Sequence, residues 1–330
     1  MRALSVIGTR PQYIKIKPIF DFCEKNNINH SIVDTCQHYS YSVSGALIKD
    51  LGLKIDHSLS FEALKELEFI AECTKALGKI FEEEEPTIVL VYGDTNSTFC
   101  AALAAYKMKI PIAHIEAGER CFDMSVPEEV NRIFVDGISK FNFCSSSRAI
   151  RNLASGIYCG DLEYELLNNL DPKISFKDFG VMTIHRQSNA TPDRIKEILS
   201  FCSIIPYKIK FYAHHRTLPL LPEEIPKNIE VHEACPYTEM VNQLSNCRFA
   251  ITDSGSVQKT SAFFGKRTLI IRGKSEWKET EKMGFAKLSN LCKTDVDWLL
   301  SDWPDRIKDL YLSQDNKSPA EIIFSTVIGE

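Results

Sequence analysis

The stretch TIVLVYGDTNSTFCAALAAYKM (residues 87–108) decides the fold class. Its first six residues, 87–92, form a continuous apolar and β-branched run that predicts a buried strand, which Gly93 ends. The following amphipathic stretch, 96–108, predicts a helix with Asp94 or Thr95 as its N-cap. A near-continuous apolar strand that leads directly into a helix is typical of a parallel sheet covered on both faces.

The same alternation of strand and helix recurs on both sides of this stretch. We predict further strands at 3–8, 31–35, 110–115, 141–145, 179–184, 208–213, 249–253 and 267–272, and a further helix at 62–81. The pattern therefore predicts an α/β protein of two doubly wound domains. Gly, Asn, Asp and Pro mix between 155 and 175, so we place the domains at 1–162 and 163–314.

The composition excludes several classes of function. A net charge of −5, with no basic stripe, argues against a nucleic-acid partner. Eleven cysteines without a CxxC pair suit reduced thiols in the cytoplasm better than disulfides or a zinc site. No segment approaches the roughly 18 apolar residues of a membrane span, and the N-terminal apolar run is too short for a signal peptide.

Polar and ionisable residues follow nearly every predicted strand. In open parallel sheets, ligands bind beyond the carboxyl ends of the strands. The residues at those ends are Gly8-Thr9-Arg10-Pro11, Gln37-His38, Gly93-Asp94-Thr95, Glu116-Ala117-Gly118, His185-Arg186, His214-His215-Arg216, Asp253-Ser254-Gly255-Ser256 and Arg272. Each of them could equally be a helix cap or a solvated loop residue. Their coincidence at one edge of both sheets favours a binding site.

The segment DSGSVQKTSAFFG (253–265) indicates the kind of ligand. Small residues around Gly255 precede a helical pattern, so backbone N–H groups at the helix start would point toward an anion. One such helix end contributes only about 0.3–1 kcal/mol at an exposed site. A diphosphate would therefore need further donors, and Arg10 and His185 are candidates.

Seven short motifs resemble those of the non-hydrolysing UDP-N-acetylglucosamine 2-epimerases. They are GTRPQYIK (8–15), TCQHY (35–39), VYGDTNST (91–98), HIEAGER (114–120), PEEVNR (127–132), TIHRQSN (183–189) and TDSGSVQK (252–259). The resemblance implies two Rossmann-like domains facing across a cleft, a GT-B-like arrangement. It also implies a homodimer, with a C-terminal helix at about 315–330 that crosses back to the first domain.

The resemblance also implies a reaction and residue roles. The reaction would be the interconversion of UDP-GlcNAc and UDP-ManNAc for glycan precursor synthesis, without metal or cofactor. The implied acid and base groups are Asp94, Glu116 and Glu128, with His185 as a further catalytic group. The implied substrate ligands are Arg10, Gln37, His185, Ser254, Gly255, Ser256, Thr260 and Arg272. Nearby acids, Glu119, Asp123 and Glu129, read as solvated or helix-start residues.

The sequence departs from the family pattern at several positions. Ser256 stands where the family usually has a second glycine, and Thr260 where a glutamate grips the uridine ribose. The segment RGKSEWKE (272–279) resembles that of relatives acting on 2,3-diacetamido uronic acid nucleotides. Such a sugar is an alternative substrate. A GT-B glycosyltransferase, a hydrolase and a binding protein without catalytic activity remain further alternatives.

Overall fold

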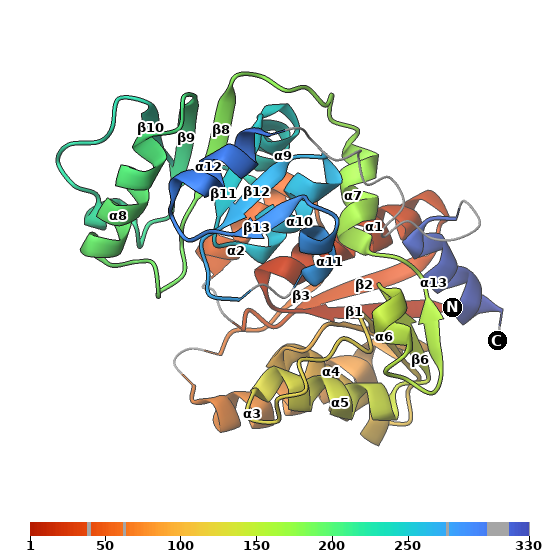
Figure 1. The fold of residues 1–330 in the computed structure, drawn as a ribbon. Helices are drawn as coiled ribbons and strands as arrows, with labels where there is room; N and C mark the ends of the chain where they lie inside the picture. Colours follow the sequence, from red (N-terminus) through yellow and green to blue (C-terminus); the bar gives the residue numbers. More distant parts are fainter. Residues whose placement is uncertain (38–40, 62–63, 275–276, 302–316, 330) are drawn as a thin grey trace. The chain divides into compact units, whose positions relative to one another are not determined.

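The chain forms two compact units in the structure, a computed structural model (Figure 1). The structure describes residues 1–37, 41–61, 64–274, 277–301 and 317–329. Unit 1 comprises Met1–Asn169 with Tyr311–Glu330, and unit 2 comprises Leu170–Leu310. Of the predictions above, His38, residues 62–63, residues 275–276 and residues 315–316 lie outside the described residues.

Unit 1 contains a parallel sheet with the strand order β3-β2-β1-β4-β5-β6-β7. Its described strands are β1 (Arg2–Ile7), β2 (Asn29–Asp34), β3 (His57–Ser58), β4 (Ile88–Tyr92), β5 (Ile112–Ile115), β6 (Phe141–Cys144) and β7 (Gly156–Tyr158). The chain builds outward from β1 in one direction and from β4 in the other. The point where the strand order reverses therefore lies between β1 and β4, where doubly wound sheets bind ligands.

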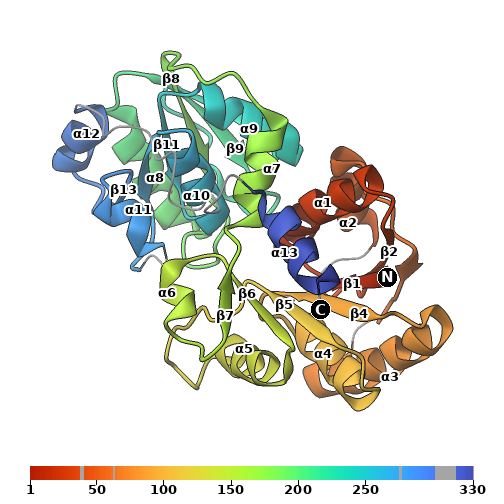
Figure 2. The same ribbon diagram turned by 90° about the vertical axis from the view of Figure 1, so that its right-hand side faces the viewer.

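Helices cover both faces of this sheet (Figure 2). The described helices of unit 1 are α1 (Arg10–Lys25), α2 (Tyr41–Leu51), α3 (Glu66–Glu84), α4 (Asn96–Lys107), α5 (Pro127–Ile138), α6 (Ser147–Ile150), α7 (Leu162–Leu170) and α13 (Pro319–Ile328). Apolar residues of α3, α4 and α5 pack on one face of the central strands, and α1, α2 and α13 lie on the other.

The last helix belongs to unit 1, as the family resemblance predicted. Phe324 of α13 stacks on Phe22 of α1 with ring centroids 5.4 Å apart. The backbone N–H of Ala320 donates to the Glu165 carboxylate at 2.9 Å, which satisfies a donor at the start of α13. Burial raises the pKa of Glu165. The C-terminal segment thus crosses from the end of unit 2 back to the first unit.

Unit 2 repeats the architecture with the parallel order β10-β9-β8-β11-β12-β13. Its strands are β8 (Phe179–Thr183), β9 (Lys208–Ala213), β10 (Ile229–Glu233), β11 (Phe249–Thr252), β12 (Arg267–Ile270) and β13 (Ala286–Leu288). Its helices are α8 (Pro192–Ser203), η1 (Leu218–Leu220), α9 (Tyr237–Asn246), α10 (Gly255–Phe263), α11 (Lys278–Lys282) and α12 (Lys293–Leu300). Here the strand order reverses between β8 and β11.

The two parallel α/β units confirm the predicted fold class. Each of the nine predicted strands is present, with bounds shifted by one or two residues at most ends. The strands that the sequence did not reveal, β3, β7, β10 and β13, are the outermost strands of the two sheets. An outermost strand is buried less completely, so it lacks the continuous apolar run that identifies a central parallel strand.

Within the described part of the chain, no helix has the length and apolar character that crossing a bilayer requires. The eleven cysteines are free thiols.

Candidate active site

One buried side chain joins the two turns at the reversal point of unit 1. Gln12, only 3% exposed, accepts through Oε1 from the backbone N–H of Gly8 at 2.8 Å and of Thr9 at 3.1 Å. Its Nε2 donates to the Tyr92 carbonyl at 2.6 Å and to Thr98 Oγ1 at 3.0 Å. Gln12 thus holds the turn after β1 against the turn after β4.

Gly8 and Gln37 fill the space beside this link. A Cβ at Gly8 would lie 2.1 Å from Thr35 Oγ1 and 2.4 Å from Ser97 Oγ, so only glycine fits. Gln37, predicted as a substrate ligand, accepts through Oε1 from the backbone N–H of Ser97 at 2.8 Å and from its hydroxyl at 2.7 Å. In this structure the side-chain amide oxygen of Gln37 therefore caps the start of α4.

Two predicted carboxylates follow neighbouring strands and are each paired with a cation. Asp94, after β4, forms an ion pair with Arg132 of α5. Glu116, after β5, forms one with Lys15 of α1. A Cβ at Gly93 would lie 3.4 Å from Glu116 Oε2, so the turns that carry the two acids touch. The structure thus brings Asp94 and Glu116 to one edge of one sheet.

The backbone at Glu116 is strained. Its φ of 66° lies in the left-handed region, which is uncommon for any residue with a side chain. Such residues cost of order 1–3 kcal/mol and cluster at functional sites. Arg132 donates to the Glu116 carbonyl, which helps to hold this conformation. The strain and its support together mark Glu116 as a residue whose side-chain direction matters.

The helix α5 supplies the groups that hold the Asp94 turn. Asn131 donates through Nδ2 to the Asp94 carbonyl at 3.1 Å and to Asn96 Oδ1 at 3.0 Å. Arg132 is buried; burial lowers its pKa, but the charges of Asp94 and Glu116 outweigh that effect and raise it overall. Its guanidinium therefore carries a positive charge that contacts the Asp94 carboxylate and the Glu116 backbone carbonyl.

A second buried network supports the same turns from inside the sheet. His114, fully buried in β5, places Nε2 2.7 Å from the Gly93 carbonyl and Nδ1 2.7 Å from Asp136 Oδ1. Arg120 Nη2 lies 2.6 Å from Asp136 Oδ2. Burial raises the pKa of Asp136, but His114 and Arg120 more than offset this and lower it. The network fixes the end of β5 to the turn after β4.

The remaining acids of this region divide into two groups. Glu128, the third predicted acid or base, is exposed in the first turn of α5. Asp123, in the loop before α5, is also exposed. The predicted ligand Arg10, at the start of α1, is exposed as well. Glu129 is a helix-start residue as expected, but it is buried. Its carboxylate accepts the backbone N–H groups of Cys121 at 2.8 Å and Phe122 at 3.1 Å.

The expectation that Glu119 is solvated was wrong. Its side chain is only 14% exposed and pairs with Arg148 at 2.7 Å. It also accepts from the Ser146 hydroxyl at 2.7 Å. Glu119 therefore fixes the loop after β5 to the start of α6, a pairing that sequence distance concealed.

In unit 2, one buried carboxylate organises the turn after β8. Asp253, fully buried, accepts from the backbone N–H of His185 at 3.1 Å and of Arg186 at 2.9 Å. Asn189 Nδ2 donates to it at 2.9 Å and to the Ile271 carbonyl at 2.8 Å. Asp253 Oδ1 also lies 3.2 Å from His185 Nδ1. The His185 side chain remains 41% exposed, so its other face is accessible.

The start of α10 lies beside this turn. Ser254 is the N-cap, and its hydroxyl accepts from the Val257 N–H at 3.4 Å, while Gly255 and Ser256 form the first turn. Arg272 donates through Nη1 to the Asp253 carbonyl at 3.4 Å. Thr260 is only 2% exposed, inside the packed face of α10. Ser254, Gly255, Ser256, His185 and Arg272 thus gather at one edge of unit 2, whereas Thr260 is buried behind it.

A histidine pair ends the neighbouring strand β9. The His214 ring lies 6.0 Å from the His185 ring and 3.9 Å from the His215 ring, centroid to centroid. Among the described residues, no group of three or more His, Cys, Asp or Glu is arranged to hold a metal ion.

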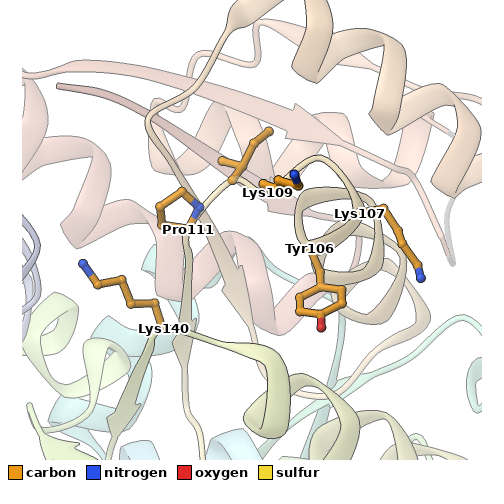
Figure 3. Close-up of a pocket in the computed structure, with 6 residues that line it drawn as sticks. Tyr106, Lys107, Lys109, Pro111 and Lys140 are labelled. Atoms are coloured by element: carbon orange, nitrogen blue, oxygen red, sulfur yellow. The ribbon is translucent and has the colours of Figure 1, made fainter.

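A surface hollow of about 480 Å³ lies elsewhere on unit 1 (Figure 3). Its lining comes from the end of α4, the loop before β5 and the start of β6: Tyr106, Lys107, Lys109, Ile110, Pro111 and Lys140. These residues lie at the amino ends of β5 and β6, the opposite edge from Asp94 and Glu116. Lysines there are placed to compensate the negative end of the α4 dipole.

Comparison with known proteins relates the chain to one family. The family model for UDP-N-acetylglucosamine 2-epimerase matches residues 21–309. The chain is 33% identical over 308 residues to the UDP-2,3-diacetamido-2,3-dideoxy-D-glucuronate 2-epimerase of Pseudomonas aeruginosa, covering 86% of this chain and 87% of the relative. It is 30% identical over 320 residues to the UDP-N-acetylglucosamine 2-epimerase of Methanocaldococcus jannaschii, covering 86% and 87%.

Solved structures agree. The crystal structure of the Methanocaldococcus jannaschii UDP-GlcNAc 2-epimerase in complex with UDP-GlcNAc and UDP matches with a TM-score of 0.80 at 26% identity, covering 100% of both chains. A glycosyltransferase of kitacinnamycin matches with a TM-score of 0.63 at only 11% identity, which shows a shared fold alone.

Proposed function

The chain belongs to the UDP-N-acetylglucosamine 2-epimerase family, a family of isomerases, and from this premise we propose that it inverts C2 of a UDP-N-acetylhexosamine. The observation that carries the proposal is the pair of cation-held carboxylates, Asp94 and Glu116, at the ligand-binding edge of unit 1. The partly exposed His185 and the α10 start at the corresponding edge of unit 2 support it.

The chemistry requires both kinds of group. C2 of the sugar has no neighbouring carbonyl, so its proton is not acidic. When the C1–O bond to UDP breaks, UDP leaves with the bonding electrons and C1 becomes positive. A base can then remove the C2 proton, whose bonding electrons form the C1=C2 double bond of a glycal. Return of a proton to the opposite face of C2, with re-addition of UDP at C1, completes the inversion.

In our proposal the groups of unit 1 move the protons. Asp94 and Glu116 are the carboxylates that exchange a proton with C2, and Arg132 and Lys15 fix their positions. Glu128, exposed at the start of α5, is the third carboxylate that we assign to the sugar ring. General acid and base catalysis contributes about 10²–10⁴-fold, so stabilisation of the departing UDP must supply much of the rest.

In the same proposal unit 2 and Arg10 hold the nucleotide. The N–H groups of Gly255 and Ser256 at the α10 start, with the Ser254 hydroxyl, bind the diphosphate. Arg10, His185 and Arg272 add positive charge, and Gln37 contributes its amide. Thr260 offers a hydroxyl where a carboxylate would grip the ribose diol. Because Thr260 is 2% exposed, we expect it to contribute least.

Two sugars are candidates. The Methanocaldococcus jannaschii relative and structure are named for UDP-GlcNAc, which favours interconversion of UDP-GlcNAc and UDP-ManNAc. The Pseudomonas aeruginosa relative is named for a diacetamido glucuronate, and the segment RGKSEWKE favours the same modified sugar. We propose that the product enters glycan precursor synthesis and that the enzyme acts as a homodimer of chains with domains at 1–162 and 163–314.

One incubation separates the candidates. The protein is mixed with UDP-GlcNAc, or with UDP-2,3-diacetamido-2,3-dideoxy-glucuronate, in D₂O, and the sugar is followed by NMR. Deuterium at C2 with a mixture of two epimers is the expected result for the true substrate. Release of free sugar would replace the proposal with hydrolysis. Absence of C2 exchange with both sugars would contradict it and leave the transferase or binding alternatives.

A further inference from the structure

We infer that Asp253 is a positioning residue for His185. The aspartate holds the imidazole with a proton on Nδ1 and favours its positively charged form, so that Nε2 presents a charge-assisted donor. The inference rests in part on the proposed function, because it assigns the partner of Nε2 as a diphosphate oxygen. The state of the ring itself can be tested without any substrate.

The two carboxylate oxygens of Asp253 contact different groups. Oδ2 accepts from the Arg186 N–H at 2.9 Å, from the Asn189 amide at 2.9 Å and from the His185 N–H at 3.1 Å. Oδ1 accepts from the His185 N–H at 3.1 Å and lies 3.2 Å from His185 Nδ1. Because both oxygens of an ionised carboxylate are acceptors only, the ring nitrogen that faces Oδ1 must carry the proton.

Burial makes this arrangement rigid. Asp253 is fully buried at the end of β11, so the carboxylate cannot turn away to water. Its backbone carbonyl accepts from Arg186 Nε at 3.1 Å and from Arg272 Nη1 at 3.4 Å, which places two guanidinium groups beside it. The His185 ring is partly exposed on its other side, which leaves Nε2 as the nitrogen directed away from the aspartate.

The charges around the ring decide which state is favoured. Asp253 faces it from the β11 end, while Arg186 on its own turn, His214 at the end of β9 and Arg272 after β12 lie nearby. The two arginines direct hydrogen bonds to the Asp253 carbonyl, whereas the Asp253 carboxylate contacts the imidazole itself. An opposite charge in direct contact favours the protonated imidazole.

An Asp253→Asn substitution tests the inference because it breaks the symmetry of the two oxygens. The amide oxygen must take the Oδ2 position to keep the three N–H donors there. The amide NH₂ then faces the ring, so Nδ1 must become an acceptor and the proton moves to Nε2. The substitution therefore changes the tautomer and removes the charge while it leaves the shape of the turn.

Side-chain ¹⁵N NMR of the ligand-free protein reads the tautomer directly, with His185→Gln used to assign the signal. The expected result is an Nδ1–H ring in the wild type that becomes Nε2–H in Asp253→Asn. Asn189→Ala is the matched control, because it removes one donor to the same carboxylate and should keep the Nδ1–H form. A wild-type ring protonated on Nε2 alone would overturn the inference, even if the variant failed to fold.

Kinetics provide the second arm once C2 exchange is established. Asp253→Asn should lower kcat by about 10²-fold, with the high-pH limb of its pH profile moved to lower pH. In a His185→Gln background the same substitution should cost little further activity, because the two residues act as a unit. An equal loss in both backgrounds would mean that Asp253 serves only the fold of the turn, and would overturn the inference.

Discussion

In both units a buried or nearly buried charged side chain holds a group at the edge of the sheet, but the sign of that charge differs between the units. In unit 1, the buried Arg132 and the nearly buried Lys15 hold carboxylates at the sheet edge. In unit 2, the buried carboxylate of Asp253 holds the His185 ring and the backbone of Arg186 at the sheet edge. Arg132 and Asp253 are the more buried members of their pairs, and each fixes the direction of a more exposed partner, Asp94 or His185. In the proposed function, unit 1 therefore presents proton acceptors, and unit 2 presents donors to an anion.

The largest effect is expected when the buried cation of unit 1 is removed. Arg132→Met leaves Asp94 without its partner and frees the strained Glu116 carbonyl. We expect a loss of about 3 kcal/mol in the free energy of unfolding and at least about 10²-fold in C2 exchange. Urea unfolding and NMR exchange measure both. Arg151→Met, at an exposed arginine, is the control and should stay within about 0.5 kcal/mol of wild type.

A second prediction concerns the close packing at Gly8, in the turn after β1. Gly8→Ala puts a methyl group 2.1 Å from Thr35 Oγ1 and 2.4 Å from Ser97 Oγ, so the turn after β1 must move. The expected cost is about 1–3 kcal/mol, with lower exchange activity. Gly45→Ala in α2 meets no atom within 4 Å and should stabilise by about 0.5–1 kcal/mol. Equal stability of the two variants in urea unfolding would contradict the close packing at Gly8.

Asp295 provides a carboxylate in unit 2 that is buried like Asp253 but has a purely structural environment. Burial raises its pKa, but hydrogen bonds from Lys287, Ser289 and the N–H groups before α12 outweigh this and lower it to about 2. A carboxyl group with a lowered folded-state pKa contributes stability above its unfolded pKa of about 3.9, and the contribution is lost as the pH falls through about 2.

Asp295→Asn should therefore destabilise by about 1–2 kcal/mol at pH 7, and the difference from wild type should narrow below about pH 4. Urea unfolding at several pH values measures it. Activity at pH 7 should be retained, in contrast to Asp253→Asn. A difference that widens toward acid pH would show that the sign of this linkage is wrong.

The smallest effects are expected at the N-caps of α4 and α10, the helices that follow β4 and β11. Thr95 caps α4 by accepting from the Thr98 N–H at 3.3 Å, and Ser254 caps α10. Each change to alanine should cost about 1 kcal/mol of stability. Only Ser254→Ala should also weaken UDP binding in calorimetry, because only α10 is assigned to the diphosphate. Equal weakening by Thr95→Ala would remove the distinction between the units.

Much of the fold and part of the candidate site could be predicted from the sequence because central parallel strands carry a continuous apolar run. The strands β4 and β11 could be predicted from their apolar runs, and with them Asp94 and Ser254, each of which lies two positions after the end of its strand. The outermost strands could not be predicted, because β3 contains only two residues and β10 is half exposed. Period and polarity carry no signal for such short or exposed segments.

The residues that hold the site were harder to predict. Gln12, Lys15 and Arg132 lie within the recognised motifs, yet their partners are 80, 101 and 38 positions away in the sequence. Only the fold brings them together. The sequence allowed two interpretations of Asp253, a helix cap or a ligand-binding residue. Its contacts show a third role, because its carboxylate holds the turn after β8.

The most direct test of the account separates the two units in one variant. Glu116→Gln removes the charge of a unit 1 carboxylate and leaves every contact of unit 2 in place. We expect unchanged UDP affinity by calorimetry, with no deuterium incorporation at C2 of the nucleotide sugar. Incorporation at the wild-type rate would contradict the assignment of proton transfer to this edge, and loss of UDP binding would contradict the division of labour between the units.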